Sequence, residues 1–237
     1  MSNSRAILFL IVHGVQYGRL STAYASDFID RLEQLIPSST PIYVRSVNWS
    51  RFIEARQQET YERLKVNHRF WLRPVLRLKA YLLTDTWWYL LNRLGKDKSD
   101  LEERTEQLVR HEIEVFLKEH PDGLVVLGGH SWGSQIALKL CYDTLKIHGL
   151  ITWGTVTYYL SGAFDDWGKP PPVKFWLNFF NPADPVAPTM LETDNFKNFV
   201  TVVPINNWLK LTPILAHTNY WKSNKMIETI AEVLQKQ

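Results

Sequence analysis

The sequence predicts an α/β protein: a doubly wound, mostly parallel six-stranded sheet with helices on both faces and a helical insert. The main observation is that short runs of β-branched and aromatic residues alternate with longer amphipathic segments, as in strand–helix units. In addition, the runs 6–12 and 124–127 are almost continuously apolar, which is typical of strands that helices cover on both faces. Neither run is therefore expected at an edge of the sheet.

The expected strands are short apolar runs bounded by turn residues. They cover Ala6–Val12, Ile42–Val47, Leu124–Leu127, Ile147–Ile151, Val173–Phe179 and Phe199–Val203.

Four segments show an apolar stripe at helical intervals. The second has the clearest ends, because Ser99 and Glu102 form a capping box and Pro121 begins a turn that stops the helix. The expected helices carry Phe28 and Leu32 and stop at Pro37, run from about Ser99 to Pro121, run from Trp132 to about Leu145, and extend from Met226 to Leu234.

Composition excludes several classes of protein. A chain of 237 residues with 45% hydrophobic content supplies a sizeable core, and a net charge of +3 does not imply a polyanionic partner. The single cysteine, Cys141, excludes a disulfide-stabilised scaffold. The apolar run 6–12 is short for a signal peptide, and no run reaches the ~20 apolar residues of a membrane span. A cytoplasmic location is expected.

The chain is expected to form a single domain, 1–237, with residues 50–98 as an inserted helical lid or cap. Within the insert, residues 61–98 mix lysines and arginines with tryptophans and tyrosines. This mixture is compatible with a lid, with a surface for a membrane or lipid, or with a solvated helix pair. A single-stranded nucleic-acid surface is the least favoured interpretation. The sequence does not indicate an oligomeric state.

A Gly-x-Ser-x-Gly motif follows the third expected strand and precedes a helix. It reads Gly129-His130-Ser131-Trp132-Gly133. Such a strand–turn–helix places the serine in a strained conformation with its hydroxyl above the sheet, and the glycines allow strand and helix to approach closely. A phosphate-binding loop is excluded, because Ser134 stands where that motif requires lysine.

An acid and a histidine follow the serine in the chain order that this architecture requires. Asp184 follows the fifth strand and His217 precedes the last helix, so all three side chains are expected at the same edge of the sheet. Asp165, Asp166 and Asp194 are the reserve candidates for the acid.

In these motifs the chain resembles the α/β-hydrolase superfamily, as a compact esterase-like or lipase-like member, over residues 6–49 and about 99–230. The resemblance implies a catalytic triad of Ser131, Asp184 and His217. His13-Gly14-Val15 is similar to the family's oxyanion loop, which implies that the N–H groups of Val15 and Trp132 hold the oxyanion. Two features depart from the family pattern: the insert precedes the nucleophile strand, and the oxyanion loop lacks the additional glycines of its longer form.

The implied activity is hydrolysis of a small carboxylic ester with an apolar acyl or alcohol group, by an acyl-enzyme route that needs no cofactor or metal. The residues expected to line the substrate pocket are His13, Gly14, Trp49, Trp153 and Phe180. The alternative interpretation is that the aromatic rings among them are ordinary core residues. The alternative function is a catalytically idle scaffold that binds lipid or protein through the insert.

Overall fold

A computed structural model describes most of the sheet and its helices. The described residues are 5–13, 19–37, 41–47, 49, 52, 59, 61–63, 101–143, 145–155, 170–184, 187, 199–205, 216–217 and 219–237. The predicted lid over 50–98 lies outside them, apart from the few positions named. The domain boundaries therefore stay a prediction.

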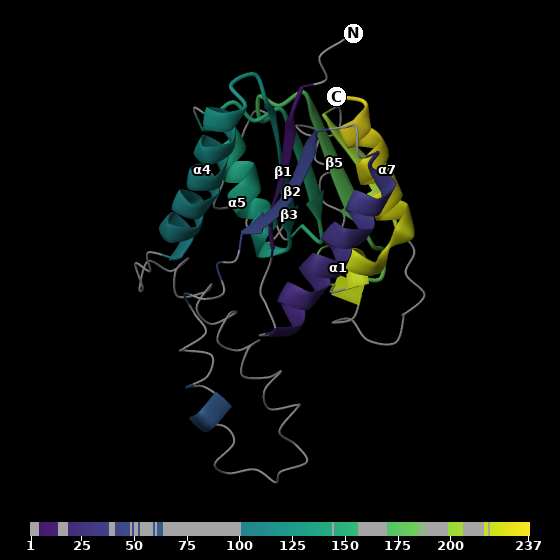
Figure 1. Cartoon of the computed structure of the whole chain (residues 1–237). Helices are drawn as coiled ribbons and strands as arrows, with labels where there is room; N and C mark the ends of the chain where they lie inside the picture. The colour runs from purple at the N-terminus through teal and green to yellow at the C-terminus, as the bar shows by residue number, and fades with distance from the viewer. Residues whose placement is uncertain are drawn as a thin grey trace.

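All strand pairs in the sheet are parallel, and the strand order is β2-β1-β3-β4-β5-β6 (Figure 1). The strands are β1 (Ile7–Val12), β2 (Ile42–Val47), β3 (Leu124–His130), β4 (Gly149–Trp153), β5 (Phe175–Phe180) and β6 (Val200–Pro204). β1 and β3 occupy interior positions, as their continuous apolar runs predicted. Because the strands are parallel, their carboxyl ends meet at one edge, which is where the predicted site residues belong.

Two cores lie on opposite faces of the sheet, and β1 contributes to both. Leu8, Leu10 and Val12 belong to one core, whereas Phe9 and Ile11 belong to the other. This alternation follows from the two-residue period of a strand, and it explains why the whole strand is apolar.

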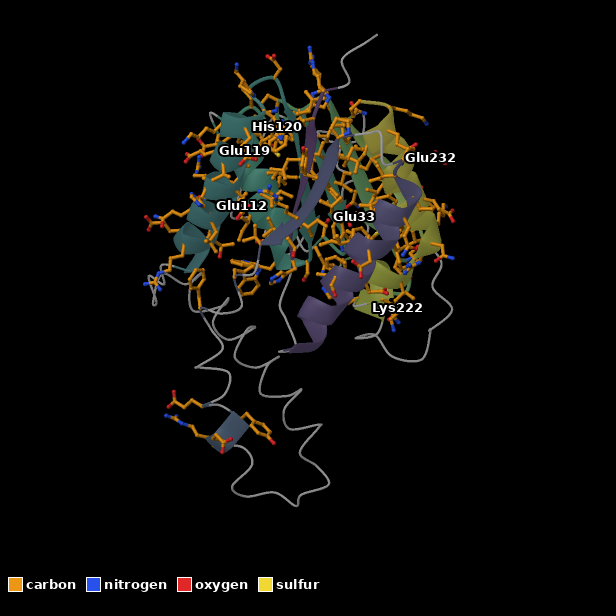
Figure 2. The ribbon with its side chains drawn as sticks, in the orientation of Figure 1. Glu33, Glu112, Glu119, His120, Lys222 and Glu232 are labelled. Carbon is orange, nitrogen blue, oxygen red and sulfur yellow. The ribbon has the colours of Figure 1, made fainter. Side chains whose placement is uncertain are left out.

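Helices cover each of the two faces (Figure 1). The core of Leu8 and Leu10 includes residues of the helices α4 and α5, and the opposite core includes residues of α1 and α7. Figure 2 shows Glu33, Glu112 and Glu232 on the outer sides of α1, α4 and α7. The elements are α1 (Arg19–Leu35), α4 (Leu101–Glu119), α5 (Trp132–Cys141), the 3-10 helix η4 (Asn219–Lys222) and α7 (Asn224–Gln235).

Several predicted boundaries differ from the structure: β4 and β5 begin two residues later than expected, and the ends of β3 and α5 were wrong by more. β3 continues to His130 instead of ending at Leu127, because Gly129 pairs with Val12 of β1 and His130 pairs with Trp153 of β4. The turn is therefore confined to Ser131. The helix α5 ends at Cys141, not near Leu145, because the N–H groups of the next two residues bond to carbonyls only three residues back. The predicted cap at Ser99 lies outside the described residues.

Within the described ranges, no helix combines the length and the apolar character needed to cross a bilayer.

His130, the last residue of β3, has its ring in the core that α1 and α7 cover. The ring is 5.2 Å from that of Trp221 and 6.2 Å from that of Trp153, measured between centroids. Burial lowers the pKa of His130 to about 3, and the charge that His217 carries when protonated acts in the same direction. The native state therefore holds His130 neutral at all ordinary pH values.

This neutral histidine predicts acid sensitivity. The unfolded chain takes up the proton near the ordinary value of 6.5, whereas the folded chain does so only near 3, so stability is lost as the pH falls between them. We expect the free energy of unfolding to fall by up to about 1.4 kcal/mol per pH unit in this window. Urea unfolding at a series of pH values measures the slope.

His130→Asn should reduce that slope, and replacement of the exposed His111 of α4 by asparagine is the matched control. An unchanged slope in His130→Asn would assign the acid sensitivity to other groups.

Candidate active site

Ser131 occupies the turn between β3 and α5 in a strained backbone conformation. Its φ is 53° and its ψ is −123°, and within the described part of the chain it is the one non-glycine residue with a positive φ. A side chain in this region is held there only by its surroundings. The main-chain N–H of Ser131 donates to the carbonyl of Trp153 (3.0 Å), and its own carbonyl accepts from the N–H of Ser134 (3.1 Å). The turn is thus bonded to β4 on one side and to α5 on the other.

The glycines of the motif permit the close packing that this turn needs. A Cβ atom at Gly133 would overlap the carbonyl oxygen of Val12 and lie 2.6 Å from that of His13. A Cβ atom at Gly129 would lie 2.5 Å from the Cα of Ser134. Any larger residue at these positions would push α5 away from β1 and β3.

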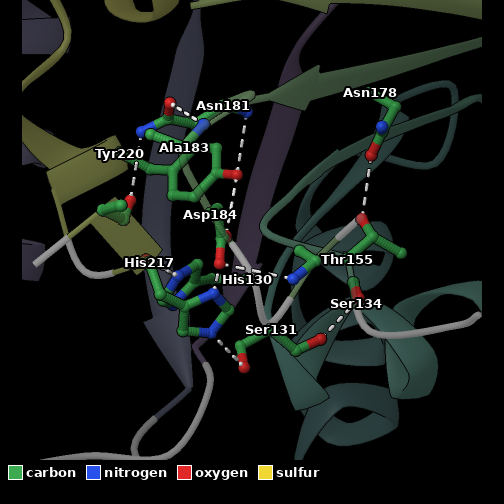
Figure 3. A network of polar contacts seen from close by, with 12 residues as sticks. His130, Ser131, Ser134, Thr155, Asn178, Asn181, Ala183, Asp184, His217 and Tyr220 are labelled. Carbon is green, nitrogen blue, oxygen red and sulfur yellow. Dashed lines mark hydrogen bonds and ion pairs between the residues drawn. The ribbon is translucent and has the colours of Figure 1, made fainter. Parts of the chain in front are cut away.

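The structure brings the three predicted side chains together at the carboxyl edge of the sheet (Figure 3). The Oγ of Ser131 lies 2.8 Å from the Nε2 of His217, and the Nδ1 of His217 lies 2.8 Å from the Oδ2 of Asp184. A ring with its Nδ1–H donated to the carboxylate presents a basic Nε2 to the hydroxyl. The arrangement can therefore move a proton from the serine to the imidazole.

The carboxylate of Asp184 is fully enclosed, with a side-chain exposure of 0%. A buried charge is tolerated only when it is paired and hydrogen-bonded. Besides the bond from His217, Oδ2 accepts one from the hydroxyl of Tyr220 (3.0 Å), and Oδ1 accepts a longer one from the N–H of Ala187 (3.3 Å). Burial, and next the charge of Asp184, raise the pKa of Tyr220, so the phenol keeps its proton and remains a donor.

Two further contacts fix the turn that carries His217. The side-chain amide of Asn181 donates to the carbonyl of Ala216 (3.3 Å), and the Nε2–H of His130 donates to the carbonyl of His217 (3.0 Å). Figure 3 shows Asn181 and His130 beside the three central side chains. The turn is thus joined to the ends of β5 and β3.

The predicted oxyanion donors are only partly described. Trp132 is the first residue of α5, so its main-chain N–H lies at the positive end of the helix dipole, directly after Ser131. Val15 and Gly14 lie outside the described residues, and the second donor stays a prediction.

The predicted pocket residues His13 and Trp49 pack beside Trp132. The indole N–H of Trp49 donates to the carbonyl of His13 (2.7 Å), and its ring meets that of Trp132 at 4.8 Å in an edge-on contact. Trp49 is only 2% exposed. It therefore anchors the end of β1, from which the predicted oxyanion loop departs.

The other two predicted pocket residues differ in burial. Trp153 is fully buried in the core with Phe28 and Trp221, whereas Phe180 is half-buried at the end of β5. A place for either ring in a substrate pocket stays a prediction.

Sequence reasoning missed Asn181 and Tyr220. Both lie close in sequence to predicted residues, Asn181 three positions before Asp184 and Tyr220 three positions after His217. No pattern marked them, because their contacts join two loops that are distant in the chain.

Cys141 is buried in the core, and burial raises the pKa of its thiol, so it is not a nucleophile. Among the described side chains, no group of three or more metal-ligating residues gathers into a candidate metal site.

No protein-family model and no curated protein sequence matches the chain. Solved structures do match, at low identity. A candidate alpha/beta hydrolase of unknown function from Agrobacterium tumefaciens is similar with a TM-score of 0.52 and 13% identity, over 98% of this chain and 85% of that one.

Two structures from Xanthomonas campestris are also similar. A candidate hydrolase of the alpha/beta superfamily, from pathovar campestris, has a TM-score of 0.49 and 13% identity, over 97% of this chain and 99% of its own. An a/b serine hydrolase without a lid has a TM-score of 0.48 and 13% identity, over 100% of this chain and 83% of its own.

The likeness to the Agrobacterium protein, together with the six parallel strands and their order, confirms the expected fold class. The chain therefore has the α/β-hydrolase fold.

Proposed function

We propose that this protein is a serine hydrolase that cleaves carboxylic esters with an apolar acyl or alcohol group. The observation that carries the proposal is the continuous chain of hydrogen bonds from the Ser131 hydroxyl through His217 to the buried Asp184. The strained backbone of Ser131 supports it, because such strain is typical of a nucleophile held above a sheet.

In the first half of the reaction, the Oγ of Ser131 attacks the ester carbonyl carbon while the Nε2 of His217 takes the hydroxyl proton. Asp184 accepts the Nδ1–H bond throughout, which holds the imidazole in the required tautomer and offsets its positive charge. When the tetrahedral intermediate collapses, His217 gives the proton to the departing alcohol, and the acyl group stays on Ser131.

The oxyanion of the intermediate is held by the N–H of Trp132 and, as the resemblance implies, by that of Val15. Each such donor contributes on the order of 3 kcal/mol to lowering the barrier. The dipole of α5 favours the same negative charge.

In the second half, water attacks the acyl-enzyme while His217 takes one of its protons. Collapse of the second intermediate releases the carboxylic acid, and His217 returns the proton to Ser131. The net reaction consumes one ester and one water and yields one acid and one alcohol.

The proposed preference for apolar groups rests on the aromatic rings near the nucleophile. Trp132 directly follows Ser131 and packs against Trp49, and Phe180 lies at the end of β5, close before Asp184. Rings of this kind offer an apolar wall to an acyl chain.

Replacement of the nucleophile tests the proposal. The wild-type protein should react with a fluorophosphonate probe and hydrolyse p-nitrophenyl esters, because both need an activated serine. Ser131→Ala should abolish labelling and lower ester turnover by about 10⁴-fold or more. The control is Ser46→Ala, which removes an exposed hydroxyl of β2. Labelling that persists in Ser131→Ala contradicts the assignment.

Replacement of the acid tests its role separately. Asp184→Asn keeps the shape of the side chain but removes the charge that fixes the tautomer of His217, so turnover should fall by about 10⁴-fold. Asp122→Asn, in an exposed turn at the opposite edge of the sheet, is the matched control. Near-normal turnover in Asp184→Asn would transfer the role to Asp165, Asp166 or Asp194, which lie outside the described residues.

A further inference from the structure

We propose that Tyr220 is a positioning residue, which holds the carboxylate of Asp184 in the orientation that His217 needs. The inference rests on the proposed function, because it assigns Tyr220 a part in the same proton transfer. Tyr220 does not contact Ser131 in any described interaction. Its ring meets that of His217 edge-on, with the centroids 6.4 Å apart, and its hydroxyl bonds to Asp184. The proposed role belongs to the hydroxyl.

The hydrogen bonds of the phenol give it a fixed direction. Its oxygen accepts the main-chain N–H of Asn181 at 3.0 Å, and the same oxygen lies 3.0 Å from the Oδ2 of Asp184. A phenol has one proton, and an ionised carboxylate can only accept. The proton of Tyr220 is therefore directed at Asp184, and the N–H of Asn181 keeps it there.

Besides the bond from His217, the carboxylate of Asp184 accepts two described bonds, and the one from Tyr220 is the shorter. The other, from the N–H of Ala187 to Oδ1, is 3.3 Å long. His217 must exchange its role between neutral base and charged acid during the reaction, so its own bond to Oδ2 changes in strength. A fixed second donor on Oδ2 keeps the carboxylate from rotating when this happens.

One turn of chain carries both groups that bond to Oδ2. His217 and Tyr220 are three residues apart, and the carbonyl of Ala216 accepts a bond from the side chain of Asn181, whose main chain also bonds to Tyr220. The loop of the acid and the turn of the base are therefore locked to each other by Asn181 and Tyr220.

The first test removes only the hydroxyl. Tyr220→Phe should lower kcat for p-nitrophenyl ester hydrolysis by about tenfold while KM changes less than twofold, because substrate binding does not involve Tyr220. The control is Tyr43→Phe, which removes a hydroxyl from the edge strand β2, and it should leave both constants unchanged. Rates are normalised to the folded fraction measured by near-ultraviolet circular dichroism. A normalised kcat within twofold of the wild type overturns the proposal.

A second variant separates the hydroxyl from the packing of the ring. Incorporation of 3-fluorotyrosine at position 220 retains both hydrogen bonds and should keep kcat within about threefold of the wild type. A loss as large as that of Tyr220→Phe would show that packing, not the bond to Asp184, is what matters, and would overturn the proposal.

A double-mutant cycle tests whether Tyr220 acts through Asp184. In an Asp184→Ala background, Tyr220→Phe should change the residual rate of fluorophosphonate labelling less than twofold, because the partner is already absent. A further tenfold loss in that background would show an independent role and overturn the proposal. A wild-type protein that neither labels nor hydrolyses esters would instead contradict the proposed function itself, so the two failures are distinguishable.

Discussion

The site depends on one strained backbone position, Ser131, which the surrounding sheet keeps in the left-handed region. Such a conformation costs on the order of 1–3 kcal/mol at a non-glycine residue. The bonds to Trp153 and Ser134 and the contact of Gly133 with the end of β1 oppose relaxation of the turn. The strain is thus maintained by elements that are themselves anchored in both cores, and local loop structure alone would not sustain it.

The buried charge of Asp184 imposes the second constraint. A carboxylate removed from water needs compensating donors, and the structure supplies them from the turn that carries His217 and Tyr220 and from the main chain at Ala187. Below the site, the neutral ring of His130 bonds to the carbonyl of His217 without adding a charge to the core. The turn of His217 is therefore joined to the aromatic core of Trp153 and Trp221 through a hydrogen bond from an uncharged ring.

Much of this architecture was predictable because its signals are local. The apolar runs of β1 and β3 indicated interior strands, and the order of Ser131, Asp184 and His217 along the chain placed them at one edge. The end of β3 was mispredicted because its two glycines resemble a turn, although neighbouring strands pair with them. Tyr220 was not predictable, since its partners are set by how two distant loops meet.

The positions of the three site residues along the chain also have a consequence for biosynthesis. The hydroxyl of Ser131 leaves the ribosome before the carboxylate of Asp184. The imidazole of His217 follows last, next to the segment that forms η4 and α7. A partly translated chain thus has a hydroxyl with no neighbour to deprotonate it. Under the proposed function, Ser131 gains its base only when the segment that carries His217 docks on the sheet, so an activated hydroxyl is a property of the finished fold alone.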